Sequence, residues 1–182
     1  LPLVDLAIID DAGTVLPQGE VGEVTIRSVC NFTGYWNNPE ATAAAFSADG
    51  RFRTGDLGYL DEDGYLFIVD RKKDIIIRGG ENISCPEVEA AAYEHDAVAE
   101  LSVFGIADDR YGEVPGLVYF TKEGSELSPD ELKSFLQAKL APFKVPVHFW
   151  RVHEPLPRLG TQKIDRVTLR REYNAKVKEL ED

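Results

Sequence analysis

The sequence predicts an α+β protein in two parts: an incomplete antiparallel β subdomain, then a small C-terminal α+β domain whose helices flank an antiparallel sheet. Two observations carry this prediction. Up to residue 72, short β-branched runs alternate with loops rich in Gly, Pro and Asp, whereas from residue 73 strand-like runs alternate with capped helices. A hydrophobic content of 43% allows a buried core. We therefore expect one part over residues 1–72 and another over residues 73–182.

The first part contains two strand-like runs, a short helix and a hairpin. The runs at 3–9 and 20–28 are separated by the loop DDAGTVLPQG. Asn38 followed by Pro39 predicts a helix N-cap with proline at the first helical position. The segment 52–71 predicts a hairpin around the turn DEDG, which lacks the ligand pattern of a calcium loop. This part is too short and too open to be a complete fold.

The second part begins with a predicted strand at 74–78. Gly79 and Gly80 follow it and permit a tight turn with positive φ. Ser84, with Glu87 three residues later, predicts a capping box at the start of a helix. The change from a period of two to a helical pattern here indicates that strands and helices are mixed beyond the boundary.

A second capping box, Ser128 with Glu131, opens another predicted helix. Its apolar residues share one face, as expected for a helix that packs on a sheet: Leu132, Phe135, Leu136 and Leu140. Three more strands and a basic final helix complete the part, at 98–106, 113–121, 145–152 and from Asp165 onward.

Charge and cysteine usage limit the possible partners and compartments. The net charge of −12 argues against nucleic acid as the main partner. Residues 133–178 nevertheless carry a local balance of +8, which fits either a solvated helix face or a patch that meets phosphates. Two cysteines without a CxxC pair indicate reduced thiols in a cytoplasmic protein. We expect no transmembrane segment, because the apolar runs are short, and no signal peptide.

Three stretches occur in an order and spacing that together are specific: FRTGDLG at 52–58, DRKKDIIIRGGENISCPEVE at 70–89 and PRLGTQKIDR at 157–166. They resemble the adenylate-forming superfamily, which includes acyl-CoA synthetases, luciferases and the adenylation domains of peptide synthetases. The GGENI…EVE form is similar to the fatty-acid–CoA ligase type. The resemblance implies that residues 1–72 end a large adenylation domain and that residues 73–182 form a mobile C-terminal lid.

The resemblance also implies a reaction in two halves. A carboxylate substrate attacks the α-phosphate of ATP, giving an acyl-adenylate and pyrophosphate. The lid then turns about a hinge, and the thiol of coenzyme A expels AMP. Lys73 matches the hinge position, where a few residues absorb a domain rotation. An ordinary linker lysine is the alternative interpretation.

Two residues match the nucleotide-binding positions of the family. Asp56 corresponds to the aspartate that accepts hydrogen bonds from the ribose hydroxyls, a role that suits a group with acceptors only. Arg71 corresponds to the arginine that reaches the ribose and phosphates with its fixed fork of donors. The alternatives are a turn aspartate beside Gly55 and a surface ion pair of Arg71 with Asp70 or Asp74.

Four residues match the coenzyme A side. Gly79 and Gly80 lie where the hairpin meets the pantetheine arm, and a missing Cβ would allow close approach, although a tight turn alone also explains the pair. Phe143 and Lys144 lie where relatives meet the coenzyme A nucleotide. The neighbouring valines, Val145 and Val147, stand where relatives have basic residues, and this weakens the assignment.

Lys163 matches the lysine that bridges the carboxylate and the α-phosphate during adenylation, where a fixed cation stabilises developing charge. The alternative is one more lysine in a basic stretch. The loop departs from the family pattern at Leu159, where Thr is common, and at Gln162, where Gly is common. We therefore expect a less flexible loop.

The family's phosphate loop, adenine segment and Mg²⁺ site have no counterpart in this sequence. The chain is therefore expected to be the C-terminal third of an ATP-dependent acyl-CoA synthetase, to lack turnover alone and to act with a missing N-terminal domain. An adenylation domain that loads a carrier protein and a non-catalytic interaction module of the same fold remain as alternatives.

Overall fold

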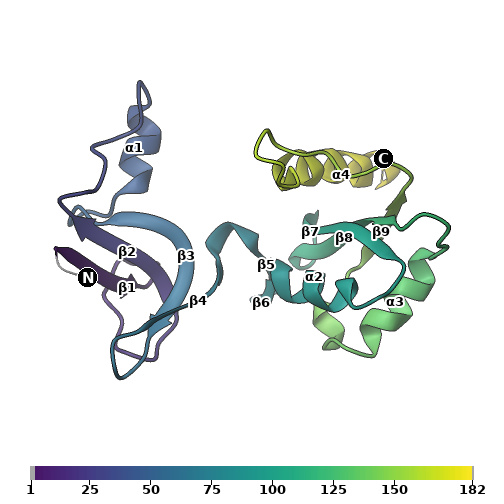
Figure 1. Cartoon of the computed structure of the whole chain (residues 1–182), viewed down its shortest axis with the longest axis horizontal. Helices are drawn as coiled ribbons and strands as arrows, with labels where there is room; N and C mark the ends of the chain where they lie inside the picture. Colours follow the sequence, from purple (N-terminus) through teal and green to yellow (C-terminus); the bar gives the residue numbers. More distant parts are fainter. Residues whose placement is uncertain (1–2, 182) are drawn as a thin grey trace. The chain divides into compact units, whose positions relative to one another are not determined.

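The computed structural model describes residues 3–181 (Figure 1). The chain divides into two compact units, Leu1–Lys73 and Asp74–Asp182, so the division lies one residue beyond the one expected from the sequence. The predicted fold class is confirmed, because each unit has a mainly antiparallel sheet and helices flank the second sheet. The first 3₁₀ helix, η1 (Lys72–Asp74), spans the division.

Unit 1 is a four-stranded antiparallel sheet in the order β1-β2-β3-β4. Its elements, with one short helix between the second and third strands, are β1 (Val4–Ile9), β2 (Gly22–Ser28), α1 (Pro39–Ala45), β3 (Phe52–Leu60) and β4 (Leu66–Arg71). Asn38 caps α1 as predicted, since its Oδ1 accepts the Ala41 N–H at 3.0 Å. The DEDG turn is also confirmed, because the Gly64 N–H donates to the Asp61 carbonyl at 3.0 Å.

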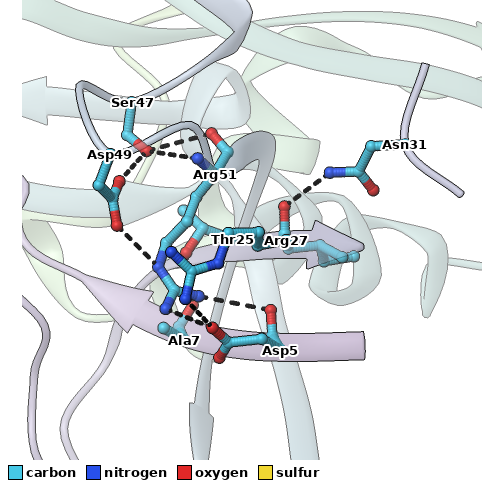
Figure 2. A network of polar contacts seen from close by, with 9 residues as sticks. Asp5, Ala7, Thr25, Arg27, Asn31, Ser47, Asp49 and Arg51 are labelled. Carbon is cyan, nitrogen blue, oxygen red and sulfur yellow. Dashed lines mark hydrogen bonds and ion pairs between the residues drawn. The ribbon is translucent and has the colours of Figure 1, made fainter. Parts of the chain in front are cut away.

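A buried arginine ties the loop before β3 to β1 (Figure 2). Arg51 is only 8% exposed; its Nη2 lies 2.8 Å from Asp5 Oδ2 and its Nε lies 3.0 Å from Asp49 Oδ2. Asp5 also accepts from Arg27 at 2.7 Å. The hydrogen bond from Arg51 holds the pKa of Asp5 below its ordinary value. A buried guanidinium without partners is strongly destabilising, so these carboxylates fix the path of the chain into β3.

The outer strand β4 and the residue before it carry a run of apolar side chains that unit 1 leaves uncovered. The run is Tyr65, Leu66, Phe67, Ile68 and Val69, with exposed fractions from 37% to 69%. Phe67 stacks on Tyr59 of β3, with ring centroids 5.2 Å apart. Among the described residues β4 pairs with β3 alone, and it is therefore an edge strand of the sheet.

Unit 2 is a five-stranded sheet in the order β6-β5-β8-β7, with β9 also paired to β8. Its strands are β5 (Ile75–Arg78), β6 (Glu81–Ser84), β7 (Val98–Asp108), β8 (Gly112–Thr121) and β9 (His148–Val152). The β8–β9 pair is parallel, an exception to the antiparallel pattern expected from the sequence. The predicted strand at 145–152 is shorter than expected, because β9 begins only at His148.

Helices cover both faces of this sheet (Figure 1). On one face α2 (Cys85–Tyr93) and α3 (Pro129–Gln137) contribute Val88 and Leu132 to a core with Val103 and Leu117. On the other face α4 (Arg166–Glu181) packs through residues such as Tyr173 against the sheet. The helices therefore hold β7 and β8 in a buried, rigid centre.

The two predicted capping boxes differ in outcome. At Ser128 the box is complete: the Ser128 side chain accepts the Glu131 N–H, and the Glu131 side chain accepts the Ser128 N–H. In the same helix Leu132 is fully buried, as predicted. At Ser84 only half forms: Ser84 Oγ accepts the Glu87 N–H at 3.2 Å. The return bond, from the Ser84 N–H to the Glu87 carboxylate, is not found among the described residues, and this carboxylate pairs with Lys144 at 2.6 Å instead. A cation from a distant segment competes successfully with the local cap.

No helix within residues 3–181 is long and apolar enough to cross a membrane.

Candidate functional site

Asp56 and Arg71 face each other across β3 and β4, where they are register partners. The Arg71 Nε donates to Asp56 Oδ1 at 2.9 Å, with side chains 55% and 30% exposed. The ion pair of Arg71 is therefore made with Asp56 and not with Asp70 or Asp74. Asp70 instead accepts the backbone N–H of Arg71 at 2.6 Å. Among the described residues no donor reaches Asp56 Oδ2, so this oxygen is open to a ligand's hydroxyl groups.

A surface cavity of about 390 Å³ lies beside this pair and has three cations in its lining. The lining residues are Thr54, Gly55, Arg71, Lys72 and Lys73. Lys72 is held by Asp11 at 2.6 Å and by Glu23 at 3.3 Å, and the bond to Asp11 raises the pKa of Lys72. Lys73 is exposed at the end of unit 1. A cavity lined in this way suits a polyanionic ligand such as a nucleotide.

Gly79 and Gly80 form the turn between β5 and β6 and have φ values of 58° and 92°. The Gly79 N–H donates to the Tyr111 carbonyl at 2.8 Å, and a Cβ on Gly79 would lie 3.2 Å from the Tyr111 ring. A Cβ on Gly80 would meet nothing within 4 Å. Positive φ favours glycine at both positions; the Tyr111 ring restricts Gly79 further, whereas Gly80 presents bare backbone to open space.

Phe143 and Lys144 lie in the short helix η2 (Pro142–Lys144). Phe143 is partly buried against the core, and Lys144 forms an ion pair with Glu87. Arg78, which the sequence did not single out, joins this segment to the glycine turn: its Nη1 donates to the Phe143 carbonyl at 2.7 Å, and its guanidinium lies 4.9 Å from the Tyr111 ring centroid. The four residues assigned to coenzyme A therefore belong to one connected surface.

Lys163 lies in a loop whose backbone is closely held. The Leu159 N–H donates to the Lys163 carbonyl at 2.8 Å. Arg158 donates to the Gln162 carbonyl at 2.7 Å and pairs with Glu100 of β7 at 2.6 Å. The Lys163 side chain itself is exposed and makes no hydrogen bond or ion pair within the described chain. A fixed backbone with a free ammonium is a suitable arrangement for meeting an anion.

Gln162 adopts φ = 66°, a left-handed conformation that is unfavourable for a residue with a Cβ. Its N–H donates to the Leu159 carbonyl at 2.9 Å and closes the turn. A left-handed φ explains why glycine is common at this position in the family. The turn nevertheless forms here with glutamine in its place. The residue before Lys163 is therefore strained, a condition that often occurs at functional sites.

The structure brings the predicted residues together in part. Asp56 contacts Arg71 directly, and the glycine turn is linked to Phe143 through Arg78. Lys163 occupies a separate loop. Within residues 3–181, no group of three or more His, Cys, Asp or Glu residues is placed to hold a metal ion.

Comparison with known proteins decides the family. Residues 87–163 match the model of the AMP-binding enzyme C-terminal domain. The long-chain-fatty-acid–CoA ligase of Bacillus subtilis is 42% identical over 90% of this chain, and the 2-succinylbenzoate–CoA ligase of Geobacillus kaustophilus is 43% identical over 92%. The chain belongs to the adenylate-forming superfamily. It spans about a third of the length of these relatives, 29% and 34%.

Solved structures of adenylate-forming enzymes match both units. ATP-bound MatB from Rhodopseudomonas palustris is 34% identical, and the match covers 96% of this chain and 35% of MatB, with a TM-score of 0.83. For apo MatB the TM-score over the same share of this chain is 0.58.

Proposed function

We propose that this chain is the C-terminal third of an ATP-dependent acid–thiol ligase that converts a carboxylate, ATP and coenzyme A into acyl-CoA, AMP and pyrophosphate. The observation that carries the proposal is the Asp56–Arg71 pair beside a cavity with three cations, in a chain of this family. A carboxylate with an open oxygen next to cations suits a nucleotide's hydroxyl and phosphate groups together. A module without catalysis would have no use for this arrangement.

In this proposal the residues divide between the two halves of the reaction. Asp56 and Arg71 hold the nucleotide, and Lys163 stabilises charge on the α-phosphate and the incoming carboxylate during adenylation. Lys73 is the hinge at the end of unit 1. Gly79 and Gly80 then lie beside the pantetheine arm.

Phe143 and Lys144 contact the nucleotide part of coenzyme A in this proposal. Lys144 must then share its charge between the ligand and Glu87. The Mg²⁺ that accompanies ATP would be held by the missing N-terminal domain. We place the reaction in the cytoplasm.

Relatives of nearly equal identity are named as ligases of a long-chain fatty acid and of 2-succinylbenzoate. We therefore assign the chain to the acid–thiol ligases as a class. A long-chain fatty acid or a related carboxylate is the first substrate to assay.

The test is a hybrid ligase, in which residues 1–182 replace the matching C-terminal segment of the Bacillus subtilis ligase. We expect the hybrid to form long-chain acyl-CoA only with ATP and coenzyme A. The 182-residue chain alone, and the upstream segment alone, should show background pyrophosphate exchange. A folded hybrid that is inactive in both half-reactions would contradict the proposal. Adenylation without transfer to coenzyme A would favour a carrier-protein acceptor.

A further inference from the structure

A compact ion-pair cluster in unit 2 contains none of the residues assigned to the reaction above. Arg166 Nη1 lies 2.9 Å from Asp74 Oδ2, and its Nη2 lies 2.8 and 2.9 Å from the two carboxylate oxygens of Glu89. The side chains of Asp74 and Glu89 are each only 15% exposed. Glu89 Oε1 also accepts the Val103 N–H at 2.8 Å. The guanidinium thus joins α4 to η1 and α2, and Glu89 extends the cluster to β7.

The charges in this cluster depend on one another. Burial raises the pKa of Glu89, and the Val103 amide and Arg166 oppose that rise without cancelling it. Burial alone would lower the pKa of Arg166, but Glu89 and Asp74 outweigh it and raise the pKa. Loss of one partner from such a buried set leaves the others uncompensated.

The position of the cluster in the chain gives it a consequence beyond stability. Asp74 directly follows Lys73 and is the first residue of unit 2. Arg166 is the first residue of α4 and lies three positions after Lys163. Just before Arg166, the Asp165 N–H donates to the Pro157 carbonyl at 2.8 Å and closes the Lys163 loop. The guanidinium therefore connects the start of the unit to the base of that loop.

An ordinary stabilising ion pair is the simpler interpretation, and α4 offers one for comparison. Arg170, one turn further along, pairs with the single carboxylate of Glu113, and its side chain is 48% exposed. Arg166 differs because its side chain is 32% exposed and is shared between two carboxylates. A planar fork that satisfies two partners fixes orientation as well as distance, which a single exposed pair does not.

We propose that Arg166 is a positioning residue for Lys163: through Asp74 and Glu89 it fixes the base of the Lys163 loop to the hinge end of unit 2. This proposal rests on the function proposed above. Rotation at Lys73 then moves the Lys163 ammonium as part of one rigid body. Without Arg166 the loop keeps its lysine but loses its fixed relation to the hinge.

The first experiment needs no activity and uses the 182-residue chain. Amide hydrogen exchange is measured at Leu159 and Asp165, whose N–H groups close the loop, and at Val118 in β8 as an internal reference. Arg166→Ala should raise exchange at the two loop amides at least roughly tenfold relative to Val118. Arg166→Lys should give an intermediate rise, because an ammonium lacks the planar fork. Arg170→Ala is the matched control and should leave the loop unchanged.

The second experiment uses the hybrid ligase and separates positioning from folding. Arg166→Lys should lower kcat for adenylation roughly tenfold at unchanged KM for ATP, because binding residues are intact while the cation is misplaced. The same variant should use synthetic acyl-adenylate and coenzyme A at nearly the parent rate.

The proposal is overturned by loop exchange that stays at the parent rate or rises only in parallel with Val118, and by an equal loss in both half-reactions. An inactive parent hybrid would instead count against the proposed function, and the exchange result would still decide whether Arg166 holds the loop.

Discussion

Lys163 depends on its own loop for its placement, since its side chain has no partner within the described chain while its carbonyl accepts from Leu159. In the hybrid ligase, Lys163→Ala should cut the rate of adenylation by roughly 10²–10³, or about 3–4 kcal/mol, by analogy with the loss of one oxyanion donor. Synthetic acyl-adenylate should still be converted at nearly the parent rate. Separate assays of the two half-reactions check this, and an equal loss in both would remove Lys163 from its assigned step.

Gln162, with φ = 66°, allows the strain beside Lys163 to be measured. A left-handed residue with a Cβ costs about 1–2 kcal/mol, and glycine adds about 0.5–1 kcal/mol of backbone entropy to folding. Gln162→Gly should therefore raise the free energy of unfolding of the 182-residue chain by up to about 1.5 kcal/mol. Gln162→Ala is the control and should give no gain. Equal stabilisation by both substitutions would show that the side chain, and not φ, is responsible.

At the scale of elements, the β5–β6 hairpin is separable from the Lys163 loop. Gly80→Leu should leave adenylation normal in the hybrid and reduce the use of acyl-adenylate with coenzyme A, because the new side chain would occupy the open side of the turn. Gly124→Leu is a matched control, since Gly124 also has positive φ, 73°, and open space around it. If both variants lose the second half-reaction equally, backbone strain explains the effect and Gly80 does not border the pantetheine arm.

The β2–β3 region of unit 1 contains a carboxylate whose titration should affect stability. Burial works to raise the pKa of Glu23, but the bonds and charges of Arg53 and Lys72 outweigh it and lower the pKa. A lowered folded pKa contributes stability above the ordinary Glu range, and this is lost as pH falls through the folded value.

Glu23→Gln should therefore reduce stability at neutral pH and flatten its decline toward acid. Urea midpoints of the 182-residue chain, from about pH 7 to about pH 3, test this. The exposed neighbour Glu20, changed to Gln, should leave the pH profile unchanged. A Glu23→Gln profile that runs parallel to the parent's would contradict the assignment.

Local signals predicted the elements well, and long-range pairing explains what they missed. Asn38 and Ser128 cap their helices as expected, because a cap needs only residues within one turn. The box at Ser84 is half formed because Lys144, 57 residues away, takes the Glu87 carboxylate. The parallel pairing of β9 and the ion pair of Arg166 with Glu89, 77 residues apart, also depend on the assembled sheet.

At the scale of the whole molecule, the chain divides after Lys73, so the proposed hinge role of Lys73 can be tested by substitution. Lys73→Pro fixes φ near −65° and should restrict rotation, so that the hybrid still adenylates but forms acyl-CoA slowly. Lys73→Ala keeps the backbone free and should behave as the parent. Loss of neither half-reaction, or of both equally, in the proline variant would exclude Lys73 as the hinge.

The uncovered strand β4 affects how the separate chain will behave in solution. Tyr65 and the four residues that follow it in β4 are uncharged, exposed and β-prone, and within residues 3–181 the strand pairs with β3 alone. Such an edge is a template for intermolecular strand addition. The 182-residue chain should therefore self-associate increasingly with concentration and precipitate first where its net charge approaches zero. Ile68→Lys would place a charge in this run that opposes strand addition, and the variant should stay monomeric.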